Sequence, residues 1–150
     1  MRYGFSGSRF LGDAGEKLVA QVLAELDDVT EATTGACVGV DACVGRYLWR
    51  TRSDIVHRVV VPADRSKVDW WWTHRCIRDS ADVLVEELPA GWTYRDRNER
   101  IVDHSDRLVA FPKWPEDDPK SRRSGTWQTV RIATRRGVPV EVYVLSRTAG

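Results

Sequence analysis

The sequence contains few of the residues that build disulfide-linked or metal-linked sites. The three cysteines are Cys37, Cys43 and Cys76, and the three histidines are His57, His74 and His104. The cysteines form neither an even disulfide set nor a CxxC half-site for zinc, so we expect reduced, mostly buried thiols. The histidines lack the i, i+4 spacing of a metal-binding helix. The sequence therefore predicts no metal site and no cofactor.

Long apolar runs are also absent. Charge or proline interrupts the apolar stretches at 57–63 and 108–112 well before the length of about 20 residues that crosses a bilayer. The first five residues, Met1 to Phe5, lack the apolar core and cleavage site of a signal peptide. We therefore expect a soluble, cytoplasmic protein with no membrane partner.

The chain has little net charge. A formal charge of +1 gives no global field that would recruit DNA, RNA or anionic lipid. Lysine occurs only at positions 17, 67, 113 and 120, so most basic residues are arginine. Arginine binds phosphate and carboxylate with two hydrogen bonds, but the codon usage of a GC-rich genome explains the same excess. Composition alone names no partner.

What the sequence does contain is an alternation of strand and helix signals. At 150 residues the chain is long enough for one core, and we expect a single domain over 1–150. The apolar patterns predict strands at 2–6, 29–34, 55–62, 83–87, 106–111 and 138–145. They predict helices at 13–26, 41 to about 50, 70–80, 94–104 and 124–136, the last capped by Gly137. The polar segment 113–123 is expected to be a mobile loop.

This alternation predicts an α/β fold. Parallel neighbours need crossover connections, and the helices supply them. We expect a Rossmann-like, open and mostly parallel sheet with helices on both faces.

Three glycine-marked turns follow predicted strands or open helices. They are Gly7-Ser8-Arg9, Gly35-Ala36 with Gly39, and Ser124-Gly125-Thr126. Glycine commonly serves only to allow positive φ, and serine or threonine only to cap a helix. In a parallel sheet, however, all three turns would lie beyond the carboxyl ends of the strands, where helix N-termini bind phosphate. None has a Walker A or a full GxGxxG pattern. Together they predict one phosphate site.

The same turns carry a family resemblance, together with Asp41 and with Arg97-Asn98 ahead of the strand at 106–111. With these motifs in this order, the chain resembles the SLOG superfamily of Rossmann-like domains. That superfamily includes the DNA-processing protein A domain, the Lonely Guy phosphoribohydrolases and putative molybdenum-cofactor carriers. The resemblance spans nearly the whole chain, although each motif is short.

The resemblance implies one pocket for a nucleotide or nucleotide-like molecule. The residues expected to line it are Gly7, Ser8, Arg9, Gly35, Ala36, Gly39, Asp41, Arg97, Asn98, Ser124, Gly125 and Thr126. Lonely Guy enzymes cleave an N-glycosidic bond with an arginine and a glutamate. Arg97 matches the arginine and is the candidate catalytic residue, but Thr129 stands where the glutamate would be. Asp41, Glu99 or Asp103 would have to replace that carboxylate.

Two further features concern partners. Arg122-Arg123 and Arg135-Arg136 are the only candidates for a DNA-facing surface, and solubility or the helix dipole explains both pairs equally well. Adjacent residues cannot share one face of an element, so Trp70-Trp71-Trp72 indicates a core position plus a homodimer contact. Trp127 is either a base-stacking residue or a core residue of its helix.

The sequence thus leads to a binding module for a phosphorylated, nucleotide-like ligand. In this hypothesis Arg9 or Arg97 neutralises the phosphate and Asp41 contacts ribose or base. The alternatives are a nucleotide N-glycosidase and a DNA-associated adaptor.

Overall fold

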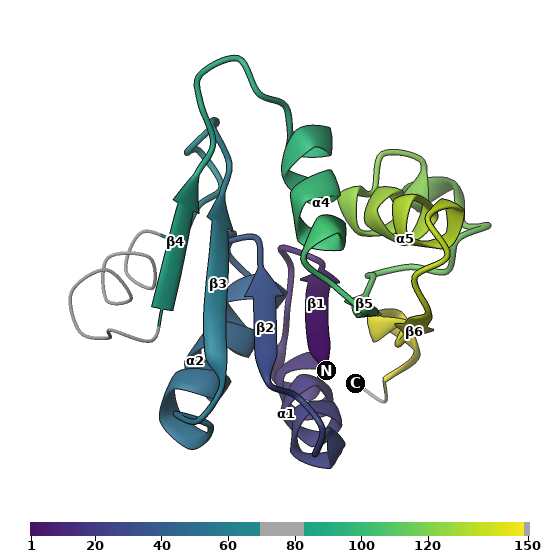
Figure 1. Cartoon of the computed structure of the whole chain (residues 1–150). Helices are drawn as coiled ribbons and strands as arrows, with labels where there is room; N and C mark the ends of the chain where they lie inside the picture. Colours follow the sequence, from purple (N-terminus) through teal and green to yellow (C-terminus); the bar gives the residue numbers. More distant parts are fainter. Residues whose placement is uncertain (70–82, 149–150) are drawn as a thin grey trace.

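The computed structural model describes residues 1–69 and 83–148, which form a six-stranded sheet with helices on both faces (Figure 1). The strands are β1 (Arg2–Gly7), β2 (Glu31–Thr34), β3 (Val56–Val61), β4 (Val83–Glu87), β5 (Arg107–Phe111) and β6 (Val140–Val142). The helices are α1 (Asp13–Glu25), α2 (Val40–Thr51), α4 (Tyr94–Asp103) and α5 (Gly125–Arg135), with the 3-10 turns η1 (Pro119–Ser121) and η2 (Leu145–Arg147). Every strand pairing is parallel, so the predicted Rossmann-like α/β fold is confirmed.

The strand order is β4-β3-β2-β1-β5-β6. The chain builds outward from β1 to β4, then returns to the other side of β1 and continues with β5 and β6. The order therefore reverses between β1 and β5. Connections leave these two strands toward opposite faces of the sheet, which opens a crevice at their carboxyl ends.

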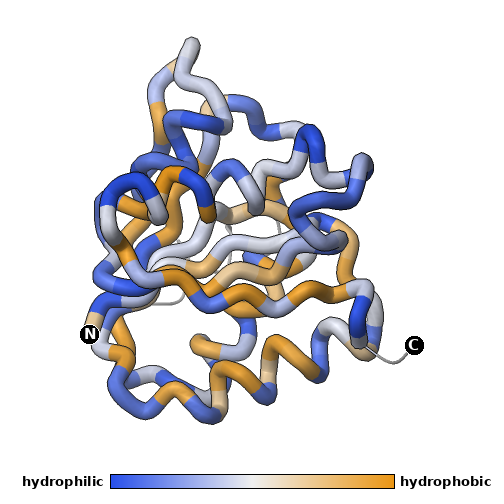
Figure 2. The backbone as a smooth tube through the Cα atoms, turned by 90° about the vertical axis from the view of Figure 1, so that its right-hand side faces the viewer, coloured by the Kyte–Doolittle hydropathy of each residue, from blue (hydrophilic) through white to orange (hydrophobic). Residues whose placement is uncertain are grey.

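The core consists of two layers, one on each face of the sheet. On β5, Val109 and Phe111 pack with α1 and α2, whereas Leu108 and Ala110 pack with α4 and α5. All four side chains are fully buried. Successive strand residues point to opposite faces, so a strand covered on both sides needs an unbroken apolar run. The hydrophobic strands in the middle of the molecule are visible in Figure 2.

A capping box fixes the start of α4. The Thr93 hydroxyl accepts a hydrogen bond from the Asp96 N–H, and the Asp96 carboxylate accepts one from the Thr93 N–H at 2.7 Å. Two of the otherwise unpaired N–H groups at the start of the helix are thereby satisfied. The cap places Arg97 and Asn98 on the buried side of the helix.

Most predicted boundaries differ from the observed ones by one or two residues, but the last strand is much shorter than predicted. The ladder of β6 covers only Val140–Val142, and the chain then turns into η2. Within the described residues, β6 is an edge strand and pairs only with β5. β5 ends at Phe111, because the next residue, Pro112, has no N–H to donate to a longer ladder. The Pro112 carbonyl instead accepts a hydrogen bond from Leu145 at 2.8 Å.

Three sequence predictions concern residues outside the described ranges. They are the helix at 70–80, the role of Trp70-Trp71-Trp72, and the environments of His74 and Cys76. Within 1–69 and 83–148, no helix is long and apolar enough to span a membrane. The same residues contain no group of three metal-ligating side chains.

Candidate functional site

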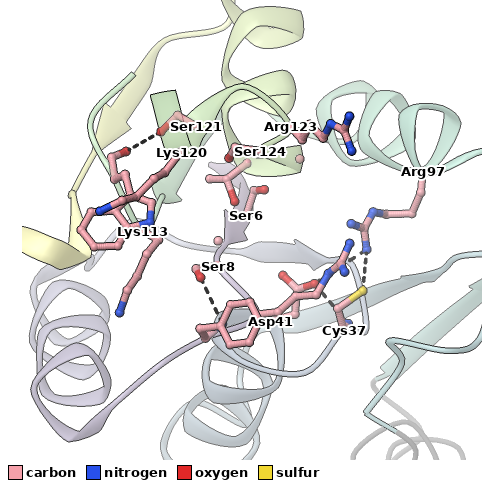
Figure 3. Close-up of a pocket in the computed structure, with 16 residues that line it drawn as sticks. Ser6, Ser8, Cys37, Asp41, Arg97, Lys113, Lys120, Ser121, Arg123 and Ser124 are labelled. Carbon is pink, nitrogen blue, oxygen red and sulfur yellow. Dashed lines mark hydrogen bonds and ion pairs between the residues drawn. The ribbon is translucent and has the colours of Figure 1, made fainter. Parts of the chain in front are cut away.

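A cavity of about 300 Å³ lies at the carboxyl ends of the strands, where the strand order reverses. Its wall comprises the end of β1 with the following turn, the residues after β5, and the start of α5 (Figure 3). This is the place where open parallel sheets bind ligands, because neighbouring connections diverge there. The volume is at the lower limit of small-molecule sites.

The turn after β1 lines the cavity as the sequence predicted. Gly7, Ser8 and Arg9 all border it. The Ser8 hydroxyl accepts a hydrogen bond from the N–H of Phe10 at 3.0 Å, which closes the turn. A Cβ on Gly7 would come within 2.5 Å of Val40, so glycine is needed here for the close packing of β1 against α2. The turn is therefore rigidly placed.

The second glycine turn supports the cavity without lining it. Gly39 has φ +85°, and a Cβ there would lie 2.4 Å from the Ser8 carbonyl oxygen. The N–H of Val40 donates to that same carbonyl at 3.0 Å. Gly35 and Ala36 are buried behind the wall. One residue of the turn after β2, Cys37, does border the cavity. The sequence analysis did not propose this residue.

Arg97 lies in a buried polar cluster with Asp41 and Cys37 at one side of the cavity. Its side chain is 10% exposed, and Nη1 donates to the Gly35 carbonyl at 2.6 Å and to Cys37 Sγ at 3.3 Å. Asp41 Oδ2 lies 3.7 Å from Nη1 and accepts the Cys37 N–H at 3.1 Å. A Cβ on Gly35 would lie 2.2 Å from Nη1, so glycine leaves the space that the guanidinium fills.

Burial governs the ionisation of this cluster. It raises the pKa of the Asp41 carboxyl, while Arg97 and the Cys37 N–H oppose the shift. It also raises the pKa of the Cys37 thiol, again with Arg97 in opposition. Cys37 is therefore a protonated thiol at neutral pH, without the thiolate character that a nucleophile needs. The Asp41 carboxylate is held toward the protein interior by the hydrogen bond from the Cys37 N–H and by the nearby Arg97 guanidinium.

Asn98 connects Arg97 to α5. Its Oδ1 accepts a hydrogen bond from Arg97 Nε at 2.9 Å, and its Nδ2 donates to Gln128 Oε1 at 2.9 Å and to the Gly125 carbonyl at 3.3 Å. Asn98 is 1% exposed and does not border the cavity. It positions the guanidinium relative to the helix start.

The third glycine turn lines the cavity in full. Ser124, Gly125 and Thr126 border it, and Ser124 caps α5 by accepting the N–H of Trp127 at 3.1 Å. The first turn of α5 contains no acidic residue. The first N–H groups of a helix have no partner within it and carry a partial positive charge. The start of α5 therefore presents a positive wall to the cavity.

The segment at 113–123 after β5, which we predicted as a mobile loop, is held in place by hydrogen bonds and forms part of the cavity wall. The carbonyl of Trp114 accepts the indole N–H of Trp127 at 2.8 Å, and Ser121 Oγ donates to the Pro115 carbonyl at 2.7 Å. Asp118 caps η1 by accepting the N–H of Lys120 at 2.9 Å. These contacts give the segment a defined path over the cavity.

Five of the lining residues that the sequence argument missed belong to this segment. They are Lys113, Trp114, Lys120, Ser121 and Arg123; the remaining missed residues are Ser6, Phe10 and Cys37. The sequence did contain a signal, because two of the four lysines of the chain, Lys113 and Lys120, follow one strand within nine residues. To assign these lysines to the cavity, one has to know that this strand pairs with β1.

The cavity is strongly cationic. Among residues 1–69 and 83–148, five basic side chains border it, against one carboxylate, Asp41; the basic residues are Arg9, Arg97, Lys113, Lys120 and Arg123. Charges of one sign that converge on a concave surface focus the field and concentrate ligands of the opposite sign. Of these, Arg9 and Arg97 also lie over the ring of Tyr94, at 5.3 and 5.5 Å from its centroid.

Thr129 occupies the sequence position where the resemblance described above would place a glutamate. Thr129 is fully buried, and its hydroxyl donates to the Gly125 carbonyl at 2.8 Å within α5. Glu99 and Asp103 pair with Arg136 and do not border the cavity. Trp127 belongs to the core beneath α5, which favours the core interpretation over base stacking.

The two arginine pairs proposed for DNA binding have different surroundings. Arg123 borders the cavity, and Arg122 is exposed beside it. Arg136 forms ion pairs with α4, and Arg135 is exposed at the end of α5.

No protein-family model matches the chain, and no curated protein matches it significantly.

Proposed function

We propose that this protein binds a phosphorylated, nucleotide-like ligand in the cavity between the ends of β1 and β5. The observation that carries the proposal is the charge of the wall, five basic side chains against one carboxylate. An anionic ligand is the chemical counterpart of such a wall, and phosphate is the anion that arginine, lysine and helix N-termini recognise together.

The basic side chains of the wall come from three places in the chain. Lys113, Lys120 and Arg123 come from the segment after β5, while Arg9 comes from the turn after β1. Arg97 is held from behind by Gly35, Cys37 and Asn98, so its guanidinium is oriented before any ligand arrives. Orientation in advance lowers the entropy cost of binding. In this proposal Asp41 fixes Arg97, instead of contacting ribose or base as the sequence argument expected.

We further propose binding without cleavage, as in sensing or sequestration. The resemblance to the SLOG superfamily supports a nucleotide-type ligand, and the same resemblance would require a carboxylate to stabilise an oxocarbenium-like transition state. Thr129 is buried in α5, and Asp41 is engaged with Arg97 and Cys37. The homodimer expected from the tryptophan run remains part of this proposal, and light scattering of the purified protein measures it.

Thermal unfolding with AMP, ADP-ribose, NAD and cyclic dinucleotides tests the proposal. A ligand present at 100 times its Kd stabilises the fold by about 2.7 kcal/mol. For a chain of this size that corresponds to a rise in Tm of about 5 to 11 °C. Release of free base is followed in the same samples by chromatography. Stabilisation without base release is expected; base release would instead establish the enzyme, and its survival in Arg97→Ala would exclude Arg97 from the reaction.

A matched pair of charge variants locates the site. The double variant Lys120→Gln/Arg123→Gln removes two exposed cations from the wall, and Lys17→Gln/Arg135→Gln removes two exposed cations elsewhere. Both change the net charge equally. Only the first should abolish the ligand-induced rise in Tm. If neither does, the ligand binds elsewhere; if none of the nucleotides binds while single-stranded DNA binds tightly and in a salt-sensitive way, the adaptor alternative holds.

A further inference from the structure

A second cavity of about 450 Å³ lies beside the cationic cavity, at the start of α1. The two share three bordering residues, Phe10, Lys113 and Trp114. The two cavities are therefore neighbours, with two aromatic side chains at their common border.

The chemistry of the wall changes across this border. Among the described residues, the second cavity has no basic side chain beyond Lys113, and its lining combines Leu11, Ala14 and Leu145 with one carboxylate, Asp13. The first cavity suits an anion, whereas the second, which has a carboxylate and several apolar side chains, suits an uncharged group. A nucleotide has both characters in one molecule, with the phosphate at one end and the flat base at the other.

The two aromatic residues stand on constrained backbone. Phe10 is held by the hydrogen bond from its N–H to Ser8 Oγ, yet its side chain is 76% exposed. Trp114 is fixed through its carbonyl, which accepts hydrogen bonds from the Trp127 indole at 2.8 Å and from Ser121 Oγ at 3.3 Å. Because these contacts use main-chain atoms, a substitution of either aromatic side chain leaves them in place.

A cation lies directly against the indole of Trp114. The ammonium of Lys120 is 4.0 Å from the ring centroid and that of Lys113 is 5.8 Å away. The phosphate-binding cations are therefore immediate neighbours of the ring, and because Lys120 covers one face of the indole, a base stacks on the other face or displaces this flexible side chain. Aromatic side chains bind bases by stacking with little preference for sequence, since every base has a π face.

We infer that Phe10 and Trp114 form the base-binding surface of the site, so that the ligand is a nucleotide lying across the border, with its phosphate in the first cavity. This inference rests on the proposed function, because the phosphate must first be held by the cationic wall. It assigns the recognition of the base to residues after β1 and β5, not to Trp127 or Asp41.

Calorimetric titration with AMP, GMP, CMP and ribose 5-phosphate tests the assignment. The wild-type protein should bind the three nucleotides about 5- to 150-fold more tightly than ribose 5-phosphate, which is the range that stacking of one base gives. Phe10→Ala and Trp114→Ala should each remove most of this preference, which is measured as the ratio of the Kd of each variant for ribose 5-phosphate to its Kd for the nucleotides. Trp114→Phe should restore much of it.

Trp92→Ala is the matched control. Trp92 is 44% exposed on the loop before α4 and borders neither cavity, so its removal should leave every Kd unchanged. Equal binding of nucleotides and ribose 5-phosphate by the wild-type protein would overturn the inference while leaving the phosphate site intact. The inference is also overturned if Phe10→Ala and Trp114→Ala keep the full preference. Absence of binding by all four probes would overturn the proposed function itself.

Discussion

Replacement of Arg97 by methionine tests the buried cluster on which the cavity depends. Methionine has a similar length and no charge, so the change removes the guanidinium with little loss of packing. Asp41, only 4% exposed, then loses its ion-pair partner, and the Gly35 carbonyl and Asn98 Oδ1 lose their donors. Breaking a buried ion pair from one side costs about 3 to 5 kcal/mol.

For a chain of this size, that loss lowers Tm by about 6 to 20 °C. Thermal and urea unfolding at pH 7 measure it. Arg95→Met is the control: this arginine lies on the same helix, 47% exposed, in an ion pair with Glu99, and its loss should cost less than about 1 kcal/mol. Arg97→Met/Asp41→Asn should recover part of the stability, because the uncompensated carboxylate is gone.

The pH dependence gives an independent check on the same variant. Burial raises the pKa of Asp41, and the removal of Arg97 takes away an opposing influence. An acid whose pKa is raised in the folded state loses stability as the pH rises from its unfolded value of about 3.9 through the folded one. The deficit of Arg97→Met should therefore be largest at neutral pH and shrink toward pH 4. A deficit below about 0.5 kcal/mol at neutral pH would refute the reasoning.

Three further predictions concern the framework around the site. Burial lowers the pKa of His57 to about 4. The unfolded chain therefore binds more protons between about pH 4 and 6.5, and wild-type stability should fall by about 3 kcal/mol as the pH drops through this window. Urea unfolding of His57→Gln should show a much smaller fall, and an equal one would contradict the assignment. Gly39→Ala should destabilise the fold by about 2 kcal/mol or more, because the added Cβ would meet the Ser8 carbonyl. The control Gly91→Ala, at a similar φ but in open space, should cost about 1 kcal/mol, and equal costs for the two variants would contradict the steric argument. Ser124→Ala should cost about 1 kcal/mol through loss of the α5 cap, measured as a shift of the urea midpoint, and no shift would show that the cap is dispensable.

Much of the fold could be predicted from the sequence because its signals are local. The run Leu108 to Phe111 indicates a strand buried on both faces, and Gly137 marks the end of α5 with φ +73°. Two of the three glycine turns line the cavity as predicted. The turn around Gly35 and Gly39 does not, because its glycines serve close packing against Ser8 and Arg97. A pattern of glycines does not distinguish a ligand from a neighbouring backbone.

The sequence by itself determined the strands, the helices and their parallel arrangement, since periodicity and capping act over a few residues. It also placed Gly7, Ser8, Arg9 and the start of α5 at one edge of the sheet. Only the tertiary structure decided that β5 lies beside β1, and with that pairing Lys113, Lys120 and Arg123 became part of the same wall. It also decided that Asp41 and Asn98 hold Arg97. Such contacts join residues far apart in the chain, and no local pattern specifies them.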